Sequence, residues 1–176
     1  MMHVLHLTIV SLYALTLAIL TVYGVHRYVQ VFLYYRHMRK RPNPTGHFDK
    51  LPKVTIQLPM YNERYVATRI IEASCQMDYP SELLQIQVLD DSTDDSADIA
   101  RECCDRMRAL GHNVDYVHRV NRTGYKAGAL ENGMHTATGE FIVIFDADFV
   151  PSPDMLKAGI NYFSDPNIGC VQTRWG

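Results

Sequence analysis

The amino-terminal segment constrains the fold more than any other part of the chain, because residues 1–25 contain no Asp, Glu, Lys or Arg. Leu, Ile, Val, Ala and Tyr dominate residues 4–25, and this run can span a bilayer as a helix, since the hydrocarbon core requires about 20 apolar residues. A signal peptide or a buried core helix is the alternative, but the amino terminus lacks basic residues and no small-residue cleavage pattern follows the run. We therefore expect one membrane-spanning helix.

Basic residues after the apolar run predict the orientation of this helix. They form a cluster that comprises Arg36, Arg39, Lys40 and Arg41. Positive charges favour the cytoplasmic side, so we expect the amino terminus outside and the rest of the chain in the cytoplasm, at a cell inner membrane or, in a eukaryote, a Golgi membrane. The helix is expected to continue out of the lipid through interfacial aromatic residues and to end before Pro42.

The remaining length suffices for one soluble domain. We expect residues 1–41 to form the membrane helix and a basic juxtamembrane segment, residues 42–52 a linker, and residues 53–176 the domain. The formal net charge of -2 gives no indication of a nucleic-acid partner, and we predict none. The four cysteines lack the spacing of a zinc or redox motif, so reduced thiols are expected.

Short apolar runs alternate with longer helical stretches from Lys53 onward. This pattern is typical of an α/β fold, in which βα units stack around a mostly parallel sheet flanked by helices. The predicted strands cover residues 54–58, 84–89, 114–117, 141–145 and 168–173. The predicted helices cover residues 65–77, 95–110, 128–137 and 155–163. Pro59 is expected to end the first strand.

Polar side chains follow three of the predicted strands at the points where these strands end. They lie in residues 59–63, 90–95 and 146–148. In open α/β sheets the ligand lies beyond the carboxyl ends of the strands, so these segments are the candidates for a binding site.

Asp146 and Asp148 are two residues apart, so an extended backbone directs both carboxylates to the same side. Two close carboxylates repel each other unless a cation neutralises them, and Mg²⁺ and Mn²⁺ prefer oxygen ligands. The same pair could instead cap a helix near Pro151. The acidic residues at the neighbouring strand end favour a metal site, and we predict that Asp146 and Asp148 bind Mn²⁺ or Mg²⁺.

The acidic run 90–95 has two interpretations. Asp94 or Asp95 is well placed to cap the helix that follows, and turn chemistry could account for part of the run. Capping does not account for Asp90 and Asp91, which come directly after an apolar strand. Their carboxylates require hydrogen-bond donors, such as a ribose hydroxyl or a base amide.

The loop 118–128 is basic, contains glycines and opens a helix. As an isolated observation it is more typical of a solvated surface turn. Opposite an acidic metal edge, the cations and backbone amides of such a loop can receive a diphosphate, and Arg122 and Lys126 are the candidates.

Four motifs in this order and spacing resemble the family 2 glycosyltransferases, especially the membrane-embedded branch related to cellulose synthase and glucomannan synthase. The motifs are Leu58-Pro59-Met60-Tyr61-Asn62-Glu63, Val88-Leu89-Asp90-Asp91-Ser92-Thr93-Asp94, Arg122-Thr123-Gly124-Tyr125-Lys126-Ala127-Gly128-Ala129-Leu130 and Phe145-Asp146-Ala147-Asp148. Residues 171–176 resemble a further segment of that branch. The match covers nearly all of residues 53–176.

The resemblance implies a GT-A fold, which is Rossmann-like, and a nucleoside diphosphate sugar as ligand, with UDP-glucose and GDP-mannose as leading donors. By analogy, the nucleoside would contact Tyr61, Glu63 and Asp91, with Asp90 nearby. Lys126 and Arg122 would lie near the base or diphosphate. Asp146 and Asp148 would bind the metal and the sugar end.

The implied reaction is inverting transfer of a hexose to a polysaccharide or lipid-linked acceptor, with the metal stabilising the departing diphosphate. The family's acceptor-side base normally lies in a later acidic motif, and processive members add a Gln-x-x-Arg-Trp motif and further membrane helices. None of these is present. Residues 172–175 should not be mistaken for the Gln-x-x-Arg-Trp motif, because they are one residue too short for it. We therefore expect a fragment that carries the donor-binding half and is inactive in transfer by itself.

Two other functions compete with this interpretation. A sugar nucleotidyltransferase would also use an acidic metal edge, but the loop after the first strand lacks the Gly-rich, basic pattern that such enzymes often use for a triphosphate. A non-catalytic, membrane-anchored nucleotide-binding or assembly module would require no acceptor base.

Overall fold

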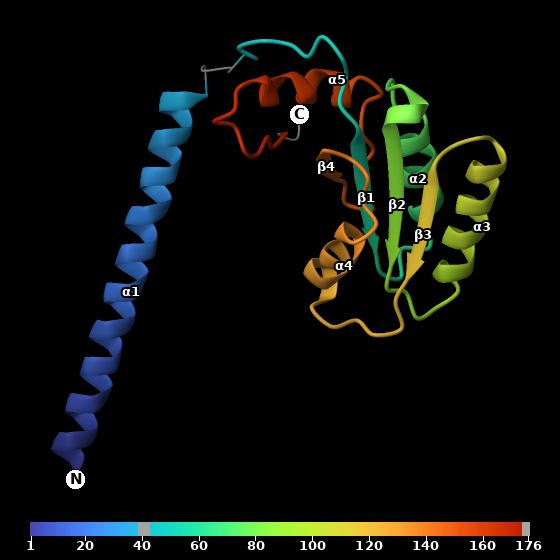
Figure 1. Cartoon of the computed structure of the whole chain (residues 1–176). Coiled ribbons are helices and arrows are strands. Elements are labelled where there is room, and N and C mark those ends of the chain that lie inside the picture. Colours follow the sequence, from blue (N-terminus) through green and yellow to red (C-terminus); the bar gives the residue numbers. More distant parts are fainter. Residues whose placement is uncertain (39–42, 174–176) are drawn as a thin grey trace. The chain divides into compact units, whose positions relative to one another are not determined.

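The computed structural model describes residues 1–38 and 43–173, which form two compact units divided between Asn43 and Pro44 (Figure 1). Each unit is described by itself. Some sequence-based expectations concern Arg39, Lys40, Arg41 and Pro42, and others concern residues 174–176. These residues lie outside the described part of the chain.

The first unit consists of the helix α1, Met2–His37, which has no buried residues. It is long and apolar enough to cross a membrane, as the sequence predicts. Its 36 residues extend over about 54 Å, which exceeds a hydrocarbon core of about 30 Å. The hydroxyls of Thr8, Thr16 and Thr21 donate to carbonyls one turn earlier at 2.8–2.9 Å, so these polar groups are satisfied within the helix.

The second unit contains a four-stranded parallel sheet with the order β3-β2-β1-β4 (Figure 1). The strands are β1 Val54–Met60, β2 Leu84–Asp90, β3 Val114–His118 and β4 Phe141–Ile144. The register pairs Met60 with Asp90 and Asp90 with His118, so the carboxyl ends of the three neighbouring strands lie level. The predicted α/β fold with a parallel sheet is confirmed.

The helices of this unit are α2 Ala67–Cys75, α3 Ser96–Ala109, α4 Tyr125–Met134 and the short α5 Met155–Ile160, with 3₁₀ turns at Ser81–Leu83 and Asn161–Ser164. The helices α2 and α3 are amphipathic and pack against each other. Their buried residues recur at helical spacing, and the apolar ones are Ala67, Ile70, Ile71 and Cys75 on α2 and Ala100, Cys103, Cys104 and Met107 on α3.

The helix α4 covers a polar row of the sheet. Because strand side chains alternate between faces, the buried Gln57 and Gln87 point away from the apolar residues that flank them. The Gln57 side chain donates to Gln87 at 3.0 Å, and Gln87 donates to the carbonyl of Gly133 on α4 at 3.0 Å. This network fixes α4 against β1 and β2, and it satisfies amides that would otherwise be costly to bury.

The strand β1 runs through Pro59 to Met60, so the expectation that Pro59 ends the first strand is wrong. The carbonyl of Gln57 accepts from the backbone N–H of Phe145, just after β4, and the carbonyl of Met60 accepts from that of Asp91, just after β2. Because backbone groups alternate in direction along a strand, the nitrogen of Pro59 faces the β4 side. The strand β4 pairs with β1 only as far as Gln57. No ladder bond is lost at Pro59, and the proline is tolerated there.

Two further expectations need correction. Residues 168–173 form no strand, although a fifth strand was predicted there. The helix α4 begins at Tyr125 rather than at residue 128, after Gly124 with φ of 73°. Gly128 lies inside the helix, and glycine is required there because a Cβ would lie 2.1 Å from the carbonyl oxygen of Thr123.

Candidate functional site

A cavity of about 360 Å³ lies beyond the carboxyl ends of β1, β2 and β4, beside the start of α4. All of the predicted site residues except Asp90 line it. They are Tyr61, Glu63, Asp91, Arg122, Lys126, Asp146 and Asp148. Four segments that are distant in the sequence therefore contribute to one site, which is the arrangement expected at this edge of an open α/β sheet.

The acidic pair lies just after β4. Asp146 and Asp148 are exposed and flank Ala147, whose side chain is buried, so both carboxylates lie on the open side of the chain. The backbone N–H of Phe149 donates to the carbonyl of Asp146 at 3.0 Å and turns the chain after the pair. Ala147 and Asp148 therefore lie in a turn, so the backbone across the pair is not extended as the sequence-based argument expects, although both carboxylates line the cavity.

Lys126 Nζ forms an ion pair with Asp146 Oδ1, and both side chains are about half exposed. Such a pair contributes at most about 1 kcal/mol, so an incoming cation can replace the ammonium group. Two carboxylates with free oxygens suit a hard divalent ion that takes its remaining ligands from another molecule. Among residues 1–38 and 43–173 no group of three or more His, Cys, Asp or Glu side chains could hold a metal alone.

Lys126 is the second residue of α4 rather than part of the preceding loop. The helix therefore brings the ammonium group and its first backbone amides to the same side of the cavity. A helix amino terminus with a lysine is favourable for a phosphate or carboxylate group.

Arg122 packs on Tyr61. The guanidinium carbon lies 3.2 Å from the centre of the Tyr61 ring and 5.2 Å from that of Tyr125. The Arg122 Nε atom is buried and has no hydrogen-bond partner. A planar cation thus covers the face of an aromatic ring in the cavity wall, where a planar base could also stack.

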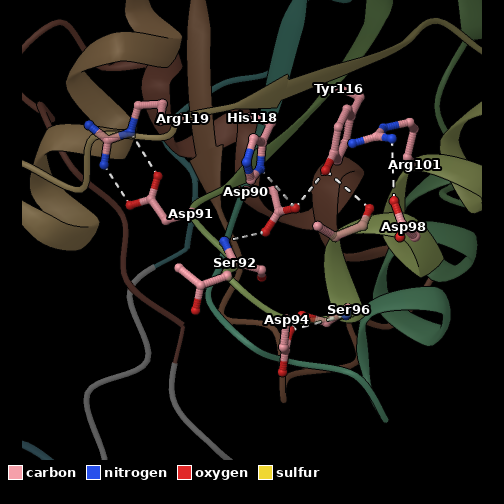
Figure 2. Close-up of polar contacts among 12 residues, drawn as sticks. Asp90, Asp91, Ser92, Asp94, Ser96, Asp98, Arg101, Tyr116, His118 and Arg119 are labelled. Atoms are coloured by element: carbon pink, nitrogen blue, oxygen red, sulfur yellow. Dashed lines mark hydrogen bonds and ion pairs between the residues drawn. The ribbon is translucent and has the colours of Figure 1, made fainter.

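Asp90 faces away from the cavity and is 1% exposed. Its carboxylate accepts hydrogen bonds from the Tyr116 hydroxyl at 2.6 Å and the Ser92 backbone N–H at 2.9 Å, and His118 Nδ1 lies 3.5 Å away (Figure 2). Burial, together with the hydrogen bond to Asp90, raises the pKa of Tyr116. In this structure Asp90 links β2 to β3 and is enclosed by these partners.

Asp91 is bound by Arg119, which the sequence-based site did not include. Arg119 Nε donates to Asp91 Oδ1 at 2.7 Å and Arg119 Nη2 to Oδ2 at 2.5 Å, a two-point contact (Figure 2). The hydrogen bond to Asp91 raises the pKa of Arg119, although burial opposes this effect. The one sequence signal for Arg119 was its position directly after β3, at the acidic edge.

The acidic run 90–95 also contacts the start of α3, although the N-cap residue, Asp95, makes no side-chain capping hydrogen bond. The Asp94 carboxylate accepts from the backbone N–H of Ser96, the first residue of α3, at 3.1 Å and from its hydroxyl. The hydrogen bond from the Ser96 side chain lowers the pKa of Asp94. Asn62 and Ser92 join the neighbouring strand ends, since the Asn62 backbone N–H donates to Ser92 Oγ at 2.8 Å. Within the run, the residue that bonds the start of α3, Asp94, and the residue that lines the cavity, Asp91, are therefore different.

Comparison with known protein families finds one family model, glycosyl transferase family 2, which matches residues 55–176. Among curated proteins, the chain is similar to glucomannan 4-beta-mannosyltransferase 2 of Arabidopsis thaliana, with 47% identity over 132 residues that cover 72% of this chain and 25% of the relative. Glucomannan 4-beta-mannosyltransferase 1 of Oryza sativa subsp. japonica is 41% identical over 155 residues, 78% of this chain and 30% of the relative. The chain thus spans about a quarter of the length of these relatives.

Among solved structures, a mannosyltransferase from Pyrobaculum calidifontis in complex with GDP-Man and Mn²⁺ is similar, with a TM-score of 0.71 and 28% identity over 88% of this chain and 46% of that chain. The S. aureus TarS fragment 1–349 shares the fold, with a TM-score of 0.52 and 23% identity over 60% of this chain and 30% of that chain. These similarities favour the glycosyltransferase interpretation over a nucleotidyltransferase.

Proposed function

Because the chain belongs to glycosyl transferase family 2, we propose that its cavity binds the nucleoside diphosphate sugar of a membrane-bound, inverting hexosyltransferase. The observation that carries this proposal is the convergence of two carboxylates, Asp146 and Asp148, and two cations, Arg122 and Lys126, on one cavity. A diphosphate with a divalent ion has the charge pattern that such a cavity complements.

GDP-mannose is the donor that we propose ahead of UDP-glucose. The names of the curated relatives specify mannosyl transfer to glucomannan, and the similar mannosyltransferase structure contains GDP-Man and Mn²⁺. The acceptor proposed on the same basis is a growing β-linked glycan, with a lipid-linked acceptor as the other class.

Each cavity residue has a proposed role. Tyr61 and Glu63 contact the nucleoside together with Asp91, and Lys126 and Arg122 neutralise the diphosphate. Asp146 and Asp148 hold Mn²⁺ or Mg²⁺, which supplies charge stabilisation to the departing diphosphate when bound. An ion held at Asp146 would compete with the Lys126 ammonium group for that carboxylate, so Lys126 would be available to a phosphate oxygen.

The membrane arrangement is also a proposal. We place the amino terminus of α1 outside and the unit that begins at Pro44 in the cytoplasm, on the basis of Arg36, Arg39, Lys40 and Arg41. The proposed division remains residues 1–41, 42–52 and 53–176. Single cysteines introduced on either side of α1 can be labelled in sealed vesicles or cells with a membrane-impermeant reagent. Labelling from outside of the cysteine after α1, and not of the one before it, would contradict this orientation.

Calorimetric titration of the full chain in detergent micelles tests the donor site. GDP-mannose and UDP-glucose are each titrated with and without Mn²⁺. We expect Mn²⁺-dependent binding that weakens at least about tenfold in the Asp146→Asn, Asp148→Asn double variant, because the ion loses both charged ligands. The matched control is Asp49→Asn, since the Asp49 side chain is 98% exposed and does not line the cavity.

A folded wild-type chain that binds neither nucleotide sugar in the presence of Mn²⁺ would contradict the proposed function. Equal binding by the double variant and the wild type would reject the metal ligands while leaving a nucleotide site.

A further inference from the structure

Arg119 connects the loop before α4 to the carboxylate of Asp91. Its backbone N–H donates to the carbonyl of Asp90 at 3.0 Å, which anchors the residue to the end of β2. Its guanidinium also donates to the carbonyls of Thr123 at 3.3 Å and Tyr125 at 3.1 Å. One side chain therefore makes contacts with two backbone carbonyls and one carboxylate.

These contacts fix the orientation of the planar guanidinium group. Thr123 and Tyr125 flank Gly124, and both Gly124 and Tyr125, the first residue of α4, have a positive φ. The carbonyls of Thr123 and Tyr125 both accept from Arg119. The Arg119 side chain is 15% exposed, so it is packed rather than solvated. A rigid two-point donor is more selective for the orientation of a carboxylate than an ammonium group, which acts as a point charge.

Asp91 accepts both hydrogen bonds of this fork (Figure 2). Its side chain is only 4% exposed, and it also lines the cavity, so a ligand in the cavity can donate a further hydrogen bond to its carboxylate. A carboxylate has about four lone-pair sites, and Arg119 uses one on each oxygen. The fork therefore sets the direction of the lone pairs that remain.

We propose that Arg119 is a positioning residue of the donor site, which orients the Asp91 carboxylate to accept an N–H or O–H hydrogen bond from the nucleoside. The inference rests on the proposed donor-binding function. It differs from a general role in folding because only the nucleoside part of the ligand depends on Asp91. Lys126 and Asp146, on the diphosphate side of the cavity, pair with each other, whereas Arg119 pairs with Asp91.

The test compares two ligands of the full chain in detergent micelles, GDP with Mn²⁺ and inorganic pyrophosphate with Mn²⁺. In Arg119→Ala we expect GDP affinity to fall by about tenfold or more, because a charged hydrogen-bond pair is lost and Asp91 is left free to rotate. Pyrophosphate affinity should change by less than about twofold. Arg119→Lys keeps the charge but lacks the fork, so we expect most of the same loss.

Two further measurements identify the route through Asp91. Guanidinium ion should restore GDP binding to Arg119→Ala, whereas methylammonium at equal ionic strength should not. The double variant Asp91→Asn, Arg119→Ala should bind GDP no more weakly than Asp91→Asn alone. The matched control is Arg106→Ala, because Arg106 pairs with Glu72 between α2 and α3, away from the cavity.

The results separate this inference from the proposed function. If the folded wild-type chain shows no Mn²⁺-dependent binding of GDP, the proposed function fails. If the wild type binds GDP and Arg119→Ala binds it equally well, only the role of Arg119 is rejected. Equal weakening of GDP and pyrophosphate, or loss of folding in both Arg119 variants, would also overturn the inference, since Arg119 would then be a general determinant of the fold.

Discussion

Substitution of Gly128 by alanine tests the packing between α4 and the loop that precedes it. An ideal Cβ at Gly128 would lie 2.1 Å from the carbonyl oxygen of Thr123 and 3.1 Å from Arg119 Nη1. Ordinary van der Waals contact begins at 3.4 Å, so the loop backbone would have to withdraw by roughly 1 Å. The Thr123 carbonyl accepts a hydrogen bond from Arg119, so its movement should also disturb the contact between Arg119 and Asp91.

The expected magnitude combines two opposing effects. Overpacking costs about 1–3 kcal/mol, while replacing glycine within a helix gains about 1 kcal/mol. Because the obstacle is backbone and not a flexible side chain, we expect the upper part of the cost and a net loss of about 1–2 kcal/mol in the free energy of unfolding. At about 2–4 °C per kcal/mol for a chain of this size, this corresponds to a fall in Tm of roughly 2–8 °C.

Thermal unfolding of the full chain in detergent, followed by circular dichroism, measures this change. The control is Gly159→Ala on α5, where a Cβ would meet nothing within 4 Å, so the helix gain alone should leave Tm unchanged or raised. GDP binding should weaken in Gly128→Ala and not in Gly159→Ala. If Gly128→Ala were as stable as Gly159→Ala and bound GDP normally, the argument from close approach would be wrong.

Two other predictions concern pH and thiol reactivity. The pKa of Asp94 is lowered in the folded chain, so its contribution to stability is present above the ordinary value of 3.8 and is lost as pH falls through the lower, folded value. Thermal unfolding between pH 5 and pH 2 should therefore lose less stability in Asp94→Asn than in the wild type, and identical curves would refute this role. Burial raises the pKa of the Cys75 and Cys104 thiols to about 12, so a thiol reagent should label the exposed Cys170 rapidly in the folded chain and these two only after unfolding. Fast labelling of Cys75 or Cys104 in the folded chain would contradict their burial.

Local sequence patterns predicted the helices and the first four strands, because the type of each element follows from the spacing of its own apolar residues. The period of apolar residues gave the locations of α2 and α3, and short apolar runs gave the first four strands. Residues 168–173 were also apolar in part, yet they form no strand, since a strand requires a partner for its backbone groups and not only a suitable sequence.

The ends of elements were less predictable. Pro59 ends a strand in general, but here its missing N–H faces a position that β4 does not reach. Similarly, the sequence predicts that a helix starts at Gly128, whereas close contact with the Thr123 carbonyl is what requires glycine there. In both cases a neighbour distant in sequence or folded back in space decides the boundary.

The sequence by itself determined that an apolar helix precedes an α/β unit and that acidic residues follow β2 and β4, because periodicity and strand-end polarity are local properties. Only the tertiary structure decided how Asp90 and Asp91 differ. Consecutive residues of a strand point to opposite faces, but the alternation does not say which face is which. Packing of Tyr116 against α3 encloses Asp90, while Arg119 holds Asp91 at the cavity. Arg119, which binds Asp91, is 28 residues away in the chain, so its position after β3 made it a candidate, but only the folded structure pairs it with Asp91.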